Sequence, residues 1–381
     1  MKYVVCVPDG ASDEPLPELG NRTPLEAAAL PNLSALAARG EVGRAATIPA
    51  GMAPGSDVGN LSILGYDPAR YHTGRAPIEA AAMGVHLDPD QVAYRCNLVT
   101  LAADGTMVDF AGGHPSTADA GEVIAALQSE LGDDEISFHA GVQYRHILVA
   151  PASWEAADCV PPHDLTGKPA VLPTGPAASR LRALMDASRE IVGASALVAN
   201  QVWFWGQGRR PVLPNFTTMH GARAGLVSAV DLVRGLGVLA GIPVTTVDGA
   251  TGWYDTNYEG KRDACLQALA DGTDLFLIHV EASDEAGHAG DVQAKVEALE
   301  NWDRRILGPL IDGLDELGAW RLLLLPDHPT PLATRTHSSD PVPYLLVDSG
   351  SEGPGGVYTE KATAASSAVP GHTLMSRLIK S

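Results

Sequence analysis

Residues 274–280 read DLFLIHV and residues 321–325 read RLLLL, and these two apolar runs decide the fold. Each run is continuous rather than alternating, which is typical of a strand buried on both faces. Residues 292–314, which lie between them, have the apolar spacing of an amphipathic helix. A strand, a helix and a second strand in this order indicate a βαβ unit and therefore a parallel sheet.

The N-terminal part of the chain repeats this pattern. Residues 3–7, YVVCV, form a third continuous apolar run, which predicts a further buried strand. Residues 24–39 have helical spacing and are followed by Gly40, a suitable residue for the end of a helix. Residues 48–55 are rich in Gly and Pro and predict a loop, and residues 56–64 predict a helix after it.

The middle of the chain has a different pattern. Segments such as YRCNLVTL at 94–101 and HILV at 146–149 alternate apolar and polar residues more often, and a Pro-rich stretch at 161–176 interrupts them. We therefore predict an α/β fold in which residues 1–87 and 217–381 form a catalytic domain. Its mostly parallel sheet is expected to carry helices on both faces. Residues 88–216 are expected to form a smaller inserted α+β domain that binds the substrate.

The composition excludes several classes of partner. The chain has 381 residues, of which 45% are hydrophobic, and a formal net charge of −20. A surface this acidic repels phosphate backbones and anionic lipids, so we expect neither nucleic acid nor a membrane as partner. An enzyme of this charge with an anionic substrate needs local positive charge, from metal ions or clustered arginines. The pattern does not predict an oligomeric state.

The cysteines and the N-terminus bear on the compartment. The four cysteines are far apart and form no CxxC pair, which is typical of a reduced intracellular protein without disulfides. The first apolar run is too short for a signal peptide and is followed by a carboxylate. No run approaches the eighteen apolar residues of a membrane span. We expect a soluble cytoplasmic protein.

Acidic and imidazole side chains follow each of the three predicted strands. Asp9 follows the first strand, and the string EASDEAGH at 281–288 follows the second. The string PDHP at 326–329 follows the third, with THSSDP at 336–341 shortly after. In an open parallel sheet, ligands bind just beyond the carboxyl ends of the strands. The sequence thus predicts that these side chains meet at one edge.

The ligand types indicate divalent cations. Asp284 and His288 are four residues apart, so a helical turn would place both on one face. Carboxylates and imidazoles without thiolates suit Mn²⁺, Zn²⁺ or Co²⁺. Six or seven such groups suit two ions, the arrangement that clamps an in-line phosphoryl displacement. Each motif alone is more often a helix cap or a hydrogen-bonded loop, and only their joint placement favours the metal site.

Ser56 begins a predicted helix after the turn sequence Pro54-Gly55. A serine at this place is commonly a structural N-cap. The same place also favours phosphate, because the helix dipole and free N–H groups point toward it. A serine hydroxyl needs a base or a metal ion to act as a nucleophile. We therefore interpret Ser56 as a nucleophile if the predicted metal ligands lie beside it.

Several long strings resemble those of one family of enzymes. PGSDVGNLSILGYDPARYHTGRAPIEAAAMG at 54–84, GATGWYDTNYEGK at 249–261 and HVEASDEAGHAGD at 279–291 are three of them. DGASDEP at 9–15, NQVWFWGQG at 200–208 and PDHPTPLATRTHSSDPVP at 326–343 are others. The chain resembles, over most of its length, the archaeal-type cofactor-independent phosphoglycerate mutases of the alkaline phosphatase superfamily.

The resemblance implies a function and a set of ligands. It implies an isomerase of glycolysis and gluconeogenesis that interconverts 3-phosphoglycerate and 2-phosphoglycerate through a phosphoserine on Ser56. It also implies two divalent metal ions, Mn²⁺ foremost and Zn²⁺ or Co²⁺ otherwise. One ion would be held by Asp284, His288 and His337, and the other by Asp9, Ser56, Asp327 and His328. Lys261 would be a catalytic residue that neutralises phosphate, although a surface lysine is an equal alternative.

A mutase must retain glycerate, whereas a phosphatase passes the phosphoryl group to water. Retention requires charged contacts to the carboxylate and exclusion of water. The inserted domain offers five side chains for this task, and we favour Arg145 with the His163–Asp164 pair. The full set is Arg95, Arg145, His146, His163 and Asp164.

Three alternatives remain from the sequence. A metal-dependent phosphomonoesterase would have the same metal site but would release phosphate. A small-molecule kinase of the homoserine kinase-like branch would need a nucleotide site, and the chain has no GxxxxGK[ST] string. A non-catalytic metal-binding or phosphate-binding protein would have no use for a nucleophilic serine.

Overall fold

The computed structural model of the chain describes residues 1–350 and 352–379. The chain divides into two compact units, Met1–His72 with Leu213–Ser381 and Thr73–Val212, which we call the sheet unit and the inserted unit. The sequence had placed the divisions after residues 87 and 216. The first division comes earlier because helix α5 (Ala76–Ala82) packs on strands of the inserted unit.

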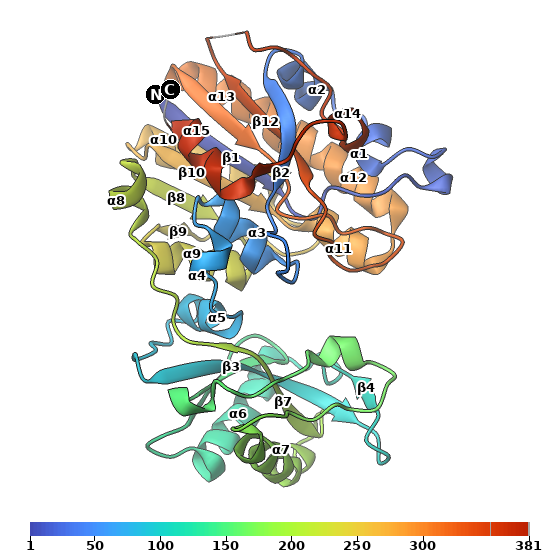
Figure 1. Ribbon diagram of the computed structural model, residues 1–381, viewed down its shortest axis with the longest axis vertical. Helices are drawn as coiled ribbons and strands as arrows, with labels where there is room; N and C mark the ends of the chain where they lie inside the picture. Colours follow the sequence, from blue (N-terminus) through green and yellow to red (C-terminus); the bar gives the residue numbers. More distant parts are fainter. Residues whose placement is uncertain (351, 380–381) are drawn as a thin grey trace. The chain divides into compact units, whose positions relative to one another are not determined.

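The sheet unit is built on an eight-stranded sheet (Figure 1). The strands β1, β8, β9, β10 and β11 form one parallel run, with β1 between β10 and β11. β12 is antiparallel to both of its neighbours, β11 and β2. In spatial order the strands are β13 (Val369–Pro370), β2 (Glu41–Ala46), β12 (Val342–Asp348), β11 (Trp320–Leu324), β1 (Lys2–Pro8), β10 (Leu275–Val280), β8 (Ala224–Val227) and β9 (Val244–Thr245).

Helices cover both faces of this sheet. The helices α10, α12 and α13 pack on one face, whereas α9 packs through Gly237 against Leu226 on the other. The helices of the unit are α1 (Pro24–Ala27), α2 (Pro31–Ala37), α3 (Ser56–Ile63), α4 (Pro68–Tyr71), α8 (Phe216–His220), α9 (Asp231–Ala240), α10 (Tyr258–Ala270), α11 (Ala282–Ala289), α12 (Val292–Trp302), α13 (Gly308–Leu317), α14 (Glu360–Thr363) and α15 (Leu374–Ile379).

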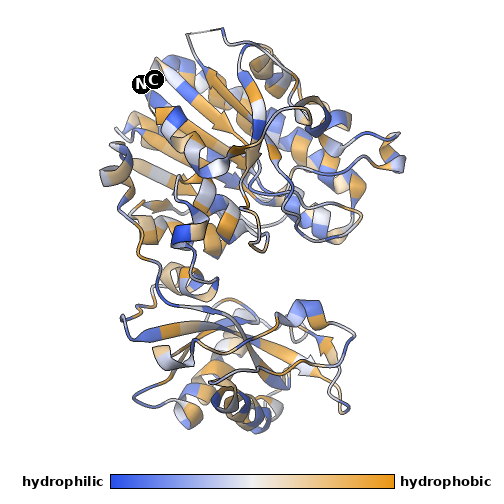
Figure 2. Cartoon of the chain, in the orientation of Figure 1, coloured by the Kyte–Doolittle hydropathy of each residue, from blue (hydrophilic) through white to orange (hydrophobic). Residues whose placement is uncertain are grey.

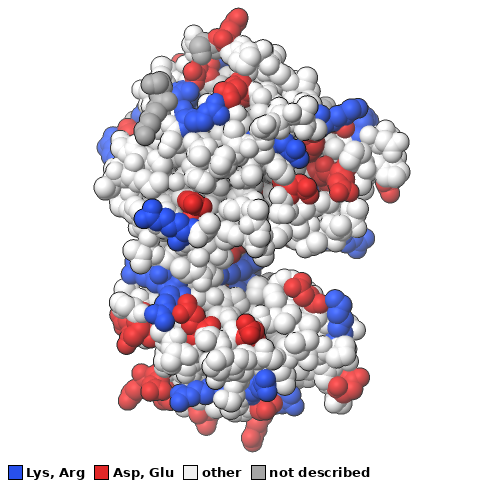
Figure 3. All heavy atoms as spheres, viewed as in Figure 1, with Lys and Arg blue, Asp and Glu red and all other residues white. Residues whose placement is uncertain are grey.

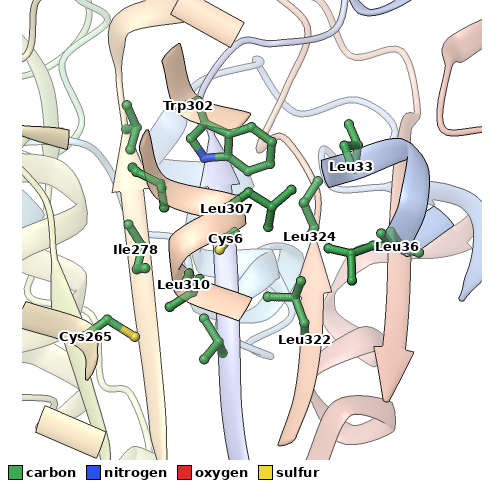
Figure 4. Packing of buried hydrophobic residues seen from close by; sticks show 14 of the residues in the cluster. Cys6, Leu33, Leu36, Cys265, Ile278, Trp302, Leu307, Leu310, Leu322 and Leu324 are labelled. Carbon is green, nitrogen blue, oxygen red and sulfur yellow. The ribbon is translucent and has the colours of Figure 1, made fainter. Parts of the chain in front are cut away.

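The core of the sheet unit consists of apolar side chains from the central strands and the covering helices. Cys6, Ile278 and Leu324 point from three neighbouring strands toward Trp302 and Leu310, as Figure 4 shows. Figure 2 shows these central strands as mainly hydrophobic and the helices as mixed. Burying one such leucine contributes about 1.5–3 kcal/mol, so this layer holds the three strand ends in a fixed relation.

Two predicted helices are interrupted in the structure. The single helix expected over 24–39 is two helices, because Pro31 begins α2 and cannot continue the hydrogen bonding of α1. The helix expected over 292–314 ends as α12 and continues after a π-helical turn, Asp303–Leu307, as α13. The strand-helix-strand order is as predicted.

The inserted unit is an antiparallel sheet with two long helices packed against it. Its central strand β3 alternates Tyr94 and Cys96 toward the helices with Ala93 toward α5. Its strands are β3 (Gln91–Leu101), β4 (Met107–Asp109), β5 (Ser137–His139), β6 (Arg145–Pro151) and β7 (Gln201–Gly208), and its long helices are α6 (Thr117–Leu131) and α7 (Ala178–Gly193). The predicted α/β class with an inserted α+β unit is confirmed.

The helices and the surface charges bear on the expected partners. Among the described residues, none of the helices has the length and apolar character to cross a membrane. On the face drawn in Figure 3, Lys and Arg side chains stand among the Asp and Glu side chains. The negative net charge is therefore not a uniform acidic field on that face.

Candidate active site

Ser56 is the first residue of α3 and is not its cap. Gly55 occupies the cap position with extended backbone, and no side chain caps this helix. The Ser56 hydroxyl instead lies 3.2 Å from Nε2 of His328. The common structural explanation for a serine at a helix start therefore does not apply here, and the hydroxyl faces one of the predicted ligands.

Asp9, Asp327 and His328 form one group beside this hydroxyl. Nε2 of His328 is 3.6 Å from Oδ1 of Asp9 and 3.4 Å from Oδ2 of Asp327. The Asp327 carboxylate is oriented by the backbone N–H groups of Gly10 and His328 and by the side-chain amide of Asn60. The group is buried, and it unites the ends of β1 and β11 with α3.

Asp284, His288 and His337 form a second group. His288 lies one helical turn after Asp284 on α11, and its Nε2 is 3.3 Å from Oδ2 of Asp284, as the spacing predicts. Nε2 of His337 is 3.5 Å from Oδ1 of Asp284. The two imidazole Nε2 atoms are 3.0 Å apart, so three ligand atoms converge on one point.

The two groups are neighbours. The rings of His328 and His337 are 4.0 Å apart between centroids. Thr330 joins the groups, because its hydroxyl donates to Oδ1 of Asp284 and lies 3.3 Å from Nδ1 of His328. Thr330 was not predicted from the sequence, since a threonine in a Pro-rich loop carries no signal of this role.

Burial and neighbouring charges shift the pKa values of four residues in these groups. Burial and the neighbouring carboxylates of Asp327 and Asp284 raise the pKa of Asp9 well above its ordinary value. Burial also acts to raise the pKa of Asp284, but hydrogen bonds from His288 and His337 outweigh it and the pKa is lowered. The pKa of His288 is raised to about 9, because its contacts with Asp284 outweigh burial. Burial lowers the pKa of His328 to about 4.

This set of residues fits divalent cations. Oδ1 of Asp9 is buried and has no hydrogen-bond partner among the described residues, although an unpaired buried oxygen of this kind is costly. A cation beside it would satisfy this oxygen and offset the repulsion between Asp9 and Asp327. Imidazole and carboxylate ligands without thiolates suit Mn²⁺, Zn²⁺ or Co²⁺.

Lys261 is paired with a carboxylate inside the sheet unit. It is fully buried on α10, with Nζ 2.7 Å from Oε2 of Glu281 and 3.0 Å from the carbonyl oxygen of His279. Its ammonium group is thus occupied by a carboxylate, and it is not a solvated surface lysine. Neutralisation of phosphate by Lys261 stays a prediction without a contact that supports it.

The substrate-binding candidates lie in the inserted unit. Arg95 is 4% exposed, forms a 2.8 Å ion pair with Glu79 and stacks over Trp205. Its pKa is lowered to about 10 by burial and by the charges of Arg75 and Arg145, against the effect of Glu79. Two guanidinium groups, those of Arg75 and Arg95, therefore pair with one carboxylate, that of Glu79. Arg75 was not among the predicted residues, although it lies in the quoted string at 54–84.

The remaining candidates differ in exposure. Arg145 lies over the ring of Tyr144, and its buried Nε has no hydrogen-bond partner among the described residues. The ring of His163 packs against Trp205 with 5.1 Å between centroids. Asp164 is exposed, and its carboxylate is 3.8 Å from His163. His146 is buried and accepts the N–H of Gly141, which is typical of a structural histidine.

Comparison with known proteins gives a consistent result. A family model described as 2,3-bisphosphoglycerate-independent phosphoglycerate mutase matches residues 37–197. A protein of Geobacter sulfurreducens named probable 2,3-bisphosphoglycerate-independent phosphoglycerate mutase is 47% identical, over 91% of this chain and 90% of its own. The 2,3-bisphosphoglycerate-independent phosphoglycerate mutase of Methanothrix thermoacetophila is 48% identical, over 92% of this chain and 91% of its own.

Solved structures agree with this likeness. The PH0037 protein of Pyrococcus horikoshii superposes with a TM-score of 0.81 at 27% identity, over 99% of this chain and 96% of its own. The cofactor-independent phosphoglycerate mutase of Thermoplasma acidophilum superposes with a TM-score of 0.63 at 25% identity, over 100% of this chain and 99% of its own. The likeness therefore includes both the sheet unit and the inserted unit.

Proposed function

Because the chain belongs to the family of 2,3-bisphosphoglycerate-independent phosphoglycerate mutases, we propose that it interconverts 3-phosphoglycerate and 2-phosphoglycerate through a phosphoserine on Ser56. The observation that carries the proposal is the contact of Ser56 with His328, beside the unpaired oxygen of Asp9. A hydroxyl at a helix N-terminus, next to ligands from two strand ends, suits an attack on phosphorus.

Two divalent ions complete the proposed site. Asp284, His288 and His337 would hold one, and Asp9, Asp327, His328 and Ser56 would hold the other. When bound, such ions lower the pKa of a ligated hydroxyl and neutralise phosphoryl oxygens. Mn²⁺ is the ion we favour, and Zn²⁺ and Co²⁺ also suit the ligands.

The proposed reaction has two phosphoryl transfers. In the first, Ser56 Oγ forms a bond to phosphorus and loses its proton, while the bond from phosphorus to the C3 oxygen breaks and that oxygen gains a proton. In the second, the C2 hydroxyl of the same glycerate forms a bond to phosphorus and loses its proton. Ser56 Oγ then leaves and regains its proton, so the enzyme returns to its starting state.

The glycerate must stay bound between the two transfers. We propose that the guanidinium groups of Arg75 and Arg145 hold its carboxylate, since arginine grips carboxylates with paired hydrogen bonds. Arg95 would act through its neighbours, because it is already paired with Glu79 and lies over the ring of Trp205. His163 and Asp164, the other predicted pair, remain candidates for contacts to the hydroxyls of the substrate.

The free thiols support a proposal for the compartment. Cys6, Cys96, Cys159 and Cys265 are all free, which suits a reducing environment. We therefore propose that the enzyme works in the cytoplasm on a small phosphorylated substrate.

A coupled assay tests the function. The full chain is given 3-phosphoglycerate without 2,3-bisphosphoglycerate, and formation of 2-phosphoglycerate is followed with and without a chelator. We expect conversion that is lost with the chelator, restored by Mn²⁺ and absent in Ser56→Ala. Release of inorganic phosphate without isomerisation would indicate the phosphomonoesterase instead, and ATP-dependent phosphorylation of homoserine would indicate the kinase.

A further inference from the structure

Four buried ionisable side chains form a continuous chain of contacts that ends at the candidate site. Lys261 contacts Glu281 at 2.7 Å, and Oε1 of Glu281 is 3.0 Å from Nδ1 of His279. Nε2 of His279 is 3.2 Å from Oδ2 of Asp9. All four residues are at most 1% exposed. Neither Glu281 nor His279 was predicted to be a site residue. Lys261 was predicted to neutralise phosphate.

Glu281 is the centre of this chain. Its carboxylate accepts hydrogen bonds from the Ser228 hydroxyl and the Ala229 N–H as well as from Lys261. Burial acts to raise its pKa, but the charge of Lys261 and the contact with His279 outweigh burial, so its pKa is lowered. A carboxylate with this many partners is rigidly held, and it fixes the ring of His279 in turn.

The consequence falls on Asp9. Both ring nitrogens of His279 lie beside carboxylates, Nδ1 at 3.0 Å from Oε1 of Glu281 and Nε2 at 3.2 Å from Oδ2 of Asp9, so the ring fixes the side of Asp9 that carries Oδ2. Oδ1 of Asp9 then has no hydrogen-bond partner among the described residues and faces His328 at 3.6 Å. These contacts thus leave Oδ1 of the buried Asp9 carboxylate without a partner among the described residues and fix its direction.

We propose that Lys261, Glu281 and His279 are positioning residues that hold Asp9 as a ligand for the cation shared with Asp327 and His328. The inference rests on the metal site of the proposed function. In this proposal Lys261 affects metal binding through Glu281 and His279, and it does not contact phosphate. Outer partners of metal ligands commonly change metal affinity by about 10- to 100-fold when they are mutated.

Binding of Mn²⁺ to the metal-stripped full chain tests the proposal without any activity. Free Mn²⁺ is measured by its paramagnetic resonance signal during titration. We expect Glu281→Gln to raise the Kd for one of two Mn²⁺ ions by about 10- to 100-fold. Wild-type affinity in Glu281→Gln would overturn the proposal.

Breaking a buried ion pair can also disturb the fold, so a double variant and a control are needed. Lys261→Met with Glu281→Gln removes both charges and restores the balance, yet it still releases His279. We expect this variant to fold and to bind Mn²⁺ weakly, whereas wild-type affinity in it would show a purely structural role. The control Asp348→Asn breaks the Arg321–Asp348 pair at the start of β11 and should leave Mn²⁺ affinity unchanged.

Kinetics separate the two roles of Lys261. As a positioning residue, Lys261→Met needs more Mn²⁺ for activity and keeps the wild-type KM for phosphoglycerate once Mn²⁺ is saturating. A phosphate contact predicts the reverse, a raised KM with unchanged Mn²⁺ affinity, and this result would overturn the proposal. If the wild type binds two Mn²⁺ ions but converts no phosphoglycerate, the proposed function fails while the affinity shifts still decide the positioning role.

Discussion

Gly59 is the residue at which one added methyl group should damage the site most selectively. It lies on α3 three residues after Ser56, and a Cβ built on it would be 2.4 Å from the backbone oxygen of Asp327. Ordinary contact of a Cβ begins at 3.4 Å. In Gly59→Ala, the helix that carries Ser56 and the loop that carries Asp327 must therefore separate by about 1 Å, the distance at which misplacement costs about 100-fold in rate.

The expected result is a loss of about 100-fold in kcat, with a loss of stability limited to about 1–3 kcal/mol for overpacking. The coupled assay measures kcat, and urea unfolding measures the free energy of unfolding. The control is Gly121→Ala on α6, where no atom lies within 4 Å of the added Cβ. Gly59→Ala with wild-type kcat would refute the close approach of α3 to the Asp327 loop.

Three further predictions concern other parts of the chain. His146 is buried with its pKa lowered to about 4, so the folded chain resists the proton that the unfolded chain takes up near its ordinary pKa of 6.5. The free energy of unfolding therefore falls by roughly 3 kcal/mol between pH 6.5 and pH 4. Urea unfolding of His146→Gln should show a smaller fall over this range, and an equal fall would contradict the lowered pKa of His146. Asp303→Ala should lower the free energy of unfolding by about 1–3 kcal/mol, because it leaves the buried N–H of Leu33, which lies 2.8 Å from Oδ1 of Asp303, without an acceptor. Thermal unfolding measures the loss, and an unchanged Tm would contradict this prediction. Arg145→Met should raise the KM for phosphoglycerate by about 10- to 100-fold, the worth of a charge-assisted hydrogen bond, whereas the exposed Arg180→Met should not; an equal effect of both would contradict the carboxylate contact.

The sequence predicted three strands of the sheet and the side chains that follow them, because both depend on local patterns. Continuous apolar runs marked β1, β10 and β11, and Asp9 and Asp327 come shortly after the first and the last of these. The strands β8 and β9 of the same parallel run were not predicted. The order of the strands was not predicted, because β1 lies between β10 and β11 although the chain runs from β10 to β11 through helices. Helix interruption at Pro31 was equally local and could have been predicted from its missing N–H.

The rest depends on contacts between residues that are far apart in the chain. His279 lies inside the apolar run of β10, and only the pairing of β1 with β10 brings it to Asp9. Thr330 and Asn60 are uncharged, and their roles appear only when α3 and the Asp327 loop meet. Lys261 was singled out by its place in the string at 249–261, but its pairing with Glu281 depends on the packing of α10 on β10.

The central claim is that Ser56 carries the phosphoryl group. The most direct measurement is mass spectrometry of the Ser56 peptide after rapid acid quenching of the Mn²⁺-loaded chain with 3-phosphoglycerate. We predict one added phosphoryl group on Ser56, which disappears in Ser56→Ala and when chelator is present. Full conversion to 2-phosphoglycerate by the Ser56→Ala chain, or a phosphoryl group found on a different residue, would contradict the account.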